Sequence, residues 1–223
     1  MLKLNEIYCG DCLEIMKDIP DKSIDLILTD PPYGINYQSN RRVMSKKFDK
    51  LENDNNSSRF QAYIEFNRIL KDNRVVICFC SFKNYAEDYI ELSKYFDIKN
   101  CIIWDKGGSG IGDLVHSLST DYEMAIIAHK GMCPIRGKRE GSVWKSGKVN
   151  PNKMFHPTEK PIDIIKKLIS TFSDENNLVL DPFLGSGTTA VACKNLNRNY
   201  IGIEKEEKYC EISRQRLRQQ NLI

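Results

Sequence analysis

Short apolar runs alternate with segments of helical periodicity along most of this 223-residue chain. The runs expected to form strands are 6–9, 24–29, 74–80, 98–104, 122–129, 178–181 and 199–204. The segments expected to form helices are 11–18, 58–71, 83–95, 161–172, 187–196 and 206–219. Such alternation is typical of βαβ units and a mostly parallel sheet. The sequence therefore predicts one doubly wound α/β domain over residues 1–223, with 98–104 and 122–129 as an antiparallel edge pair.

The composition is that of an ordinary globular protein, with 41% hydrophobic and 28% charged residues. No run of about 20 apolar residues occurs, so no membrane span is expected. The first residues lack an apolar signal core, which predicts a cytoplasmic protein. The net charge of +3 is mild and indicates no partner by itself.

The eight cysteines are expected to be core residues rather than ligands. Cys78 and Cys80, for example, lie in an apolar run, where free cysteine commonly packs. Cys9 and Cys12 have the spacing of half a zinc site, but no second cysteine pair or histidine cluster follows. The sequence therefore predicts no metal site.

A chemically unusual motif, Asp30-Pro31-Pro32-Tyr33, directly follows the apolar run 24–29. It places a carboxylate, a rigidly held proline carbonyl and an aromatic ring at the tip of a buried strand. The two oxygens can accept the protons of an exocyclic amino group while the ring stacks on the base. The motif therefore predicts chemistry at an amino nitrogen of a planar base.

A second motif starts at the end of the expected strand 178–181 and runs from Asp181 to Thr189. It contains Gly185 and Gly187, which are expected to let a ligand approach the backbone closely. The next expected strand ends in Glu204, which is suited to bind ribose hydroxyls or, alternatively, is only a solvated acid at a helix start. The glycine spacings of dinucleotide and phosphate loops are absent. These features predict a nucleoside cofactor without a pyrophosphate.

Two polar segments, 34–57 and 130–155, resist assignment to regular elements. Each follows an expected strand, so both are expected to lie at the active end of the sheet. The first is interpreted as an active-site loop that contacts nucleic acid, and the second as a small basic target-recognition insertion, unless it is a solvated surface loop. The candidate residues for this contact are Arg41, Arg42, Lys46, Arg136, Lys138, Arg139 and Lys145.

Taken together, these motifs resemble those of the β-group of DNA amino-methyltransferases, which use S-adenosylmethionine. Three blocks carry the resemblance: Ile7–Cys12 through Gly34, His156–Pro161, and Leu180–Thr189 through Glu204. Glu159 stands where glutamine is more common, and Leu184 where alanine is more common. The resemblance implies a class I S-adenosylmethionine-dependent methyltransferase fold, circularly permuted, with a seven-stranded sheet.

The resemblance also implies roles for individual residues. The target base would be held by Asp30, Pro31, Pro32 and Tyr33. The cofactor would be bound by Asp11, Cys12, Asp30, Thr158, Lys160, Asp181, Pro182, Phe183, Gly185, Gly187, Thr188 and Glu204. Asp11 would meet the adenine of the cofactor, although it could instead cap a helix. Thr158 and Lys160 would lie near the methionine carboxylate, although Lys160 could instead be a solvated cation.

The expected reaction is methylation of adenine N6 in a base flipped out of double-stranded DNA. Cytosine-N4 methylation is the alternative, since both bases present an amino group on a six-membered ring. Methylation of RNA or protein amides is disfavoured by Asp30, where those enzymes commonly have asparagine. The acids at both motifs argue against a non-catalytic DNA binder. A homodimer would enlarge the DNA footprint of so short a chain, and a restriction partner is one possible context.

Overall fold

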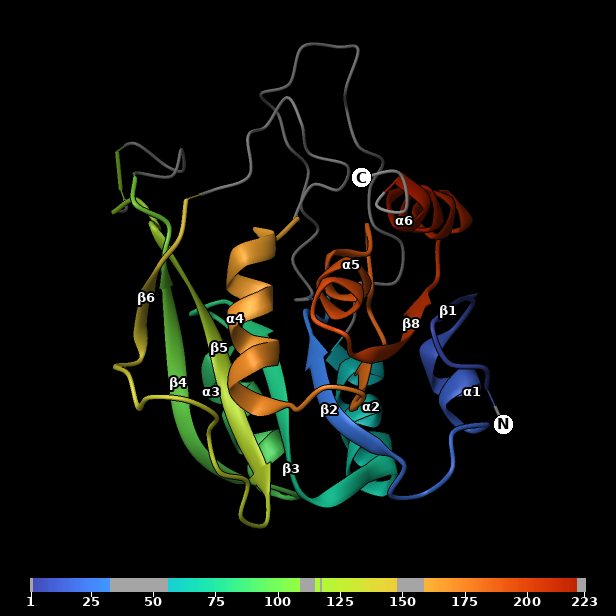
Figure 1. Cartoon of the computed structure of the whole chain (residues 1–223). Helices are drawn as coiled ribbons and strands as arrows, with labels where there is room; N and C mark the ends of the chain where they lie inside the picture. Colours follow the sequence, from blue (N-terminus) through green and yellow to red (C-terminus); the bar gives the residue numbers. More distant parts are fainter. Residues whose placement is uncertain (1, 33–55, 109–114, 117, 148–158, 220–223) are drawn as a thin grey trace.

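The computed structural model describes residues 2–32, 56–108, 115–116, 118–147 and 159–219. They form a sheet in the order β1-β8-β7-β2-β3-β5-β4-β6, with helices on both faces (Figure 1). The strands are β1 Glu6–Cys9, β2 Ile24–Thr29, β3 Leu70–Cys80, β4 Asp97–Asp105, β5 Tyr122–Lys130, β6 Val143–Lys145, β7 Leu178–Asp181 and β8 Asn199–Glu204. The helices are α1 Cys12–Met16, α2 Asn56–Ile69, α3 Tyr85–Ser93, α4 Ile162–Phe172, α5 Thr188–Asn195 and α6 Glu207–Gln219. The predicted doubly wound α/β fold is therefore confirmed.

The sheet has eight strands in the described part of the chain, so the predicted number of seven was wrong. The additional strand, β6, is only three residues long and offers too few positions for a periodic pattern. Tertiary pairing creates it: Trp144 lies in register with Trp104 of β4, and both rings are buried. The antiparallel pairing of β4 with β5 was predicted correctly, but β6 rather than either of them forms that edge.

Alternating side chains of the central strands build two separate cores. Leu26 and Leu28 of β2 belong to a core that includes residues of α4, α5 and α6. Ile27 belongs to the opposite core, with residues of α1, α2 and α3. The sheet is thus covered by three helices on each face, as Figure 1 shows most clearly for α4 and α5 on the near side. No helix in the described residues is long and apolar enough to cross a membrane.

The topology brings an early strand, β2, and a late strand, β7, together near the centre of the sheet. β7 pairs in parallel with β2 on one side and with β8 on the other, and β8 in turn pairs with β1. From β2 the chain moves one way to β3, and from β7 it moves the other way to β8. In such sheets, ligands bind at the carboxyl ends of the strands where the winding direction reverses. The fold therefore directs attention to the ends of β2 and β7.

Candidate active site

Asp30 and Asp181, the acids of the two sequence motifs, lie at the carboxyl ends of adjacent parallel strands. The register pairs Leu26 with Val179 and Ile27 with Leu180, so β2 and β7 reach the same edge of the sheet. The hydroxyl of Thr29, the residue before Asp30, donates a hydrogen bond to Oδ1 of Asp181 at 3.1 Å. Motifs that are about 150 residues apart in the chain thus form one site.

Asp30 belongs to a chain of alternating charges. Nζ of Lys160 lies 2.5 Å from Oδ2 of Asp30 and 2.9 Å from Oε2 of Glu123. Nζ of Lys106 lies 2.6 Å from the other carboxylate oxygen of Glu123. Lys160 also lies over the ring of Phe79, 5.0 Å from its centroid. The structure therefore places Lys160 beside the predicted catalytic carboxylate rather than in solvent.

The buried groups of this network stay charged because each lies next to a group of opposite charge. Burial by itself lowers the pKa of Lys160, but the carboxylates of Asp30 and Glu123 outweigh it and raise that pKa overall. Burial likewise raises the pKa of Glu123, and the two lysines outweigh it and lower that pKa overall. Lys160 therefore remains an ammonium and Glu123 a carboxylate at neutral pH.

Asp181 lies beneath the glycine turn and organises it. Its carboxylate accepts hydrogen bonds from Oγ1 of Thr189 at 2.6 Å and from the backbone N–H of Phe183 at 3.1 Å. Burial raises the pKa of Asp181 to about 7, and the hydrogen bonds, including that from Thr29, only partly oppose it. Pro182 is buried, and Phe183 packs against the core that includes α1 and α2. Asp181 is thus part of the frame of the turn.

Gly187 is required by its backbone conformation and by the packing of α6. Its φ is +85°, and an added Cβ would lie 2.7 Å from both Cβ and Oγ of Ser213 in α6. The hydroxyl of Ser213 also donates to the carbonyl of Gly185 at 2.9 Å. Gly187 therefore meets a packing requirement, since α6 occupies the space beside it, and the expected close approach of a ligand stays a prediction.

Glu204 ends β8 close to this turn. Its carboxylate accepts hydrogen bonds from the N–H groups of Gly185 at 2.8 Å and Glu206 at 2.9 Å. Burial raises the pKa of Glu204, although the two backbone donors oppose the rise. The interpretation of Glu204 as merely a solvated acid at a helix start was wrong, because the side chain is tied to the glycine turn.

Arg216 of α6 joins the glycine turn to the second sequence block, and sequence reasoning did not find it. Its guanidinium donates to the carbonyl of Ser186 at 2.7 Å and to Oγ1 of Thr188 at 3.3 Å. It also lies 2.9 Å from Oε1 of Glu159, whose side chain is 5% exposed. Burial lowers the pKa of Arg216, and Glu159 opposes this. Glutamine is more common at position 159, and the glutamate of this chain gives Arg216 a fully charged partner.

Glu123 and Lys106 were also not predicted as site residues from the sequence. Glu123 is the second residue of β5, which runs antiparallel to β3. The start of an antiparallel strand lies at the same edge as the carboxyl ends of its parallel neighbours, so Glu123 faces the site. An acid at the start of an apolar run is a weak signal, and it gains meaning only once the strand direction is known.

Asp11 and Cys12 lie at the start of α1. The side chain of Asp11 accepts a hydrogen bond from the N–H of Leu13 at 2.9 Å and so caps this helix. Cys12 is 8% exposed and packs in the core, where burial raises its pKa to about 12. The capping interpretation of Asp11 is confirmed, and contact of either residue with a cofactor stays a prediction.

Part of the predicted site lies outside the described residues. Pro31 is buried and Pro32 half-buried at the end of β2. Tyr33, Arg41, Arg42, Lys46 and Thr158 lie outside the described ranges, and so do almost all of 34–57 and part of 130–155. The roles expected for these residues remain predictions.

The loop after β5 does not lie wholly at the active end of the sheet, and this expectation was wrong. Because β5 is antiparallel, its last residue Lys130 pairs with Arg74 near the start of β3, at the opposite edge. Arg136, Lys138 and Arg139 line a hollow of about 510 Å³ between α4 and the sheet there. Arg136 is held by Asp174 at 2.6 Å.

Lys145 differs from these three basic residues. It ends β6, which runs parallel to β4, and it pairs in register with Asp105 at the active edge. Its side chain is 83% exposed and lies 3.7 Å from Asp105. Of the candidate DNA-binding residues that the structure describes, Lys145 therefore lies at the active end of the sheet.

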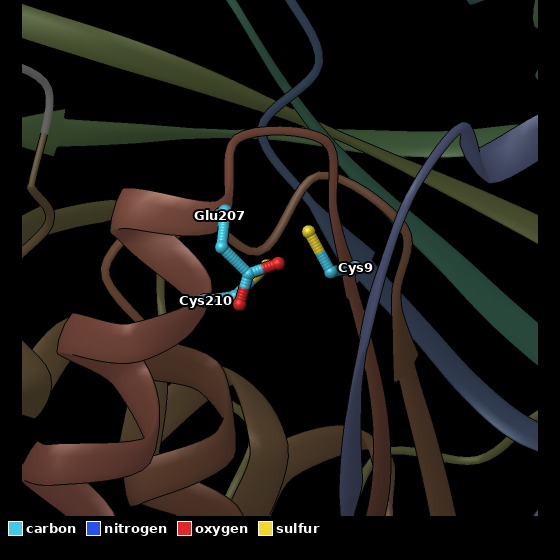
Figure 2. A group of neighbouring side chains, drawn as sticks. All are labelled: Cys9, Glu207 and Cys210. Carbon is cyan, nitrogen blue, oxygen red and sulfur yellow. The ribbon is translucent and has the colours of Figure 1, made fainter.

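Cys9 lies near Cys210 and Glu207 of α6 (Figure 2). The two sulfurs and a carboxylate oxygen lie within 4.8 Å of one another. Burial and contacts within the group raise the pKa of both thiols, while Arg214 lies 3.1 Å from Glu207. The thiols of Cys9 and Cys210 lie 3.8 Å and 3.4 Å from the carbonyl oxygens of Lys205 and Glu204, so these side chains link β1 to the segment that leads into α6.

Comparisons with known proteins agree with this geometry. A family model described as DNA methylase matches residues 24–215. The type II methyltransferase M.HinfI of Haemophilus influenzae is 33% identical, over 97% of this chain and 69% of its own length. The type II methyltransferase M2.MboI of Moraxella bovis is 30% identical, over 94% of this chain and 86% of its own.

Solved structures are similar over nearly the whole chain. A complex of M1.HpyAVI with SAM has a TM-score of 0.76 and 30% identity, and covers 95% of this chain and 98% of that one. The cytosine-N4-specific PvuII DNA methyltransferase has a TM-score of 0.74 at 17% identity, over 94% and 85% of the two chains, a likeness of fold alone. With Asp30 and Asp181 of its two motifs joined at one edge of the sheet and a family model that spans most of its length, this chain belongs to the DNA methylase family.

Proposed function

We propose that this protein transfers a methyl group to the N6 amino group of an adenine flipped out of double-stranded DNA. The observation that carries the proposal is the position of Asp30. It lies at the edge where β2 and β7 meet, on the same side of the sheet as the glycine turn and Glu204, which is bound to that turn. In this proposal Asp30 is the proton acceptor for the amino group, and the glycine turn with Glu204 binds the nucleoside of the cofactor. S-adenosylmethionine, when bound, supplies an electrophilic methyl group.

The residues of the glycine turn fit that cofactor. Glu204 is held by Gly185 and Glu206 at the end of β8, where an acid can accept from ribose hydroxyls. Phe183 in the same turn is half-buried and offers an apolar surface for a ring. We assign the other cofactor contacts to Asp11, Cys12, Thr158, Lys160, Asp181, Pro182, Gly187 and Thr188. Thr158 and Lys160 would face the methionine carboxylate.

The chemical task is to make a weak nucleophile reactive. The lone pair of an adenine amino group is delocalised into the ring, so it must be localised before it attacks. Asp30 and the carbonyl of Pro31 would accept the two amino protons and draw the nitrogen toward tetrahedral geometry. Asp30 also stabilises positive charge that develops on the nitrogen. Tyr33 would stack on the flipped base, which offsets part of the cost of unstacking, since such stacking is worth about 1–3 kcal/mol.

Replacement of Asp30 tests the proposal. We expect Asp30→Ala to lower methyl transfer by about 100-fold or more, a usual cost of removing an electrostatic partner from a transition state. Asp30→Asn should also lose activity although it keeps an oxygen for Lys160, and both variants should retain affinity for S-adenosylmethionine. The measurements are tritiated methyl transfer to duplex DNA and calorimetric titration of the cofactor. A normal transfer rate in either variant would refute the role of Asp30.

Mass analysis of nucleosides from the methylated DNA decides between the bases. N6-methyladenine supports the proposal, whereas N4-methylcytosine would replace it with the alternative. The mass of the protein in solution, with and without DNA, tests the proposed homodimer.

A further inference from the structure

Glu123 contacts the active site through a lysine rather than directly. It lies on β5, which is separated from β2 by β3 in the sheet. Lys160 crosses the end of β3 above Phe79 and reaches Asp30 on one side and Glu123 on the other. We propose that Glu123 is a positioning residue that clamps Lys160 on Oδ2 of Asp30. This inference rests on the proposed function, since it assigns a role in methyl transfer.

The local contacts show why Glu123 serves Lys160. Its Oε1 is paired with Lys106 at 2.6 Å, and Lys106 in turn lies 5.3 Å from the centroid of the Trp104 ring. Its Oε2 is buried and accepts no well-aligned hydrogen bond among the described residues. The ammonium of Lys160 at 2.9 Å is therefore the charge that compensates Oε2. A buried carboxylate oxygen without such a partner would be strongly destabilising.

The clamp has a direct consequence for Asp30. A lysine with one carboxylate partner can swing on its flexible stem, whereas two carboxylates on opposite sides hold the ammonium in place. Lys160, held in this way, fixes Oδ2 of Asp30 and with it the orientation of the carboxylate toward the base. Loss of Glu123 would let Lys160 and Asp30 move together. A displacement of about 1 Å in such a site can cost up to about 100-fold in rate.

A double-mutant cycle on the full-length protein tests this clamp. The variants are Glu123→Gln, which keeps the size but removes the charge, Lys160→Met, and the combination of the two. We expect Glu123→Gln to lower kcat by about 10-fold or more, as such a displacement implies, while the KM for DNA stays unchanged. In the Lys160→Met background, Glu123→Gln should have little further effect on kcat, because Glu123 acts through Lys160. Glu91→Gln is the matched control, because it breaks a Glu–Lys pair of 2.5 Å on α3 and should leave kcat unchanged.

A second readout does not depend on activity. The side-chain ammonium of Lys160 should give a slowly exchanging ¹⁵N signal in the wild type that broadens in Glu123→Gln but not in Glu91→Gln. Full kcat in Glu123→Gln, additive effects in the cycle, or an unchanged ammonium signal would each overturn the inference. If the wild type methylates no DNA, the proposed function fails and the assignment to methyl transfer fails with it. The ammonium signal then still shows whether the clamp itself exists.

Discussion

Replacement of Gly187 by alanine should show that the glycine turn is shaped by helix α6. Gly187 has a φ of +85°, a conformation that costs an L-residue about 1–2 kcal/mol. The new Cβ would also lie 2.7 Å from Cβ and Oγ of Ser213, and such overpacking costs about 1–3 kcal/mol. We therefore expect a loss of about 2–5 kcal/mol. For a domain of this size, that loss lowers Tm by about 4–20 °C.

Gly137→Ala is the matched control for this experiment. Gly137 also has a left-handed conformation, with a φ of +76°, but nothing lies within 4 Å of its added Cβ. Its replacement should cost only the backbone strain of about 1–2 kcal/mol, and so lower Tm by about 2–8 °C. Ser213→Gly should restore part of the stability of Gly187→Ala, because it removes the two clashing atoms. Thermal and urea unfolding measure all four proteins, and equal losses in Gly187→Ala and Gly137→Ala would refute the reasoning.

Three further predictions follow from buried or exposed charges. The pKa of Asp181 is raised to about 7 in the folded protein, so the folded state binds the extra proton and the free energy of unfolding falls as pH rises from about 4 to 7. Asp181→Asn should flatten this dependence in urea titrations at several pH values, and a slope equal to that of the wild type would contradict it. Arg216→Met should destabilise the fold by about 3–5 kcal/mol, because it removes the guanidinium that pairs with the buried carboxylate of Glu159, and Glu159→Gln should recover part of the loss in the same unfolding assay. Lys145→Ala should reduce the salt dependence of DNA binding by about one unit of logarithmic slope, whereas Lys138→Ala at the opposite edge should not, and the reverse pattern in a binding titration would overturn the placement.

Local sequence patterns predicted the fold well where the pattern and the tertiary environment agree. The runs that became β2, β7 and β8 were located at their observed bounds, because buried parallel strands read as continuous apolar segments. The strand β6 could not be predicted, since a three-residue strand has no period and forms only because β4 offers an unpaired edge.

The residues of the candidate site also fall into two groups, those that local sequence patterns predicted and those that only the structure identified. Asp30, Asp181 and Glu204 were found because each directly follows an apolar run, and Asp30 and Asp181 are also followed by proline. Glu123, Lys106 and Arg216 escaped notice because nothing local distinguishes them from surface charges. Their roles depend on partners that lie far away in the sequence.

The sequence by itself determined the class of fold, the two motifs and their order, because strand runs, turns and flanking acids are local properties of the chain. Only the tertiary structure decided which charges face the site. The antiparallel direction of β5 brings Glu123 to the active edge and carries Arg136, Lys138 and Arg139 to the other. The approach of α6 explains why position 187 must be glycine. Strand direction and helix contact are set by long-range packing, which short sequence patterns do not encode.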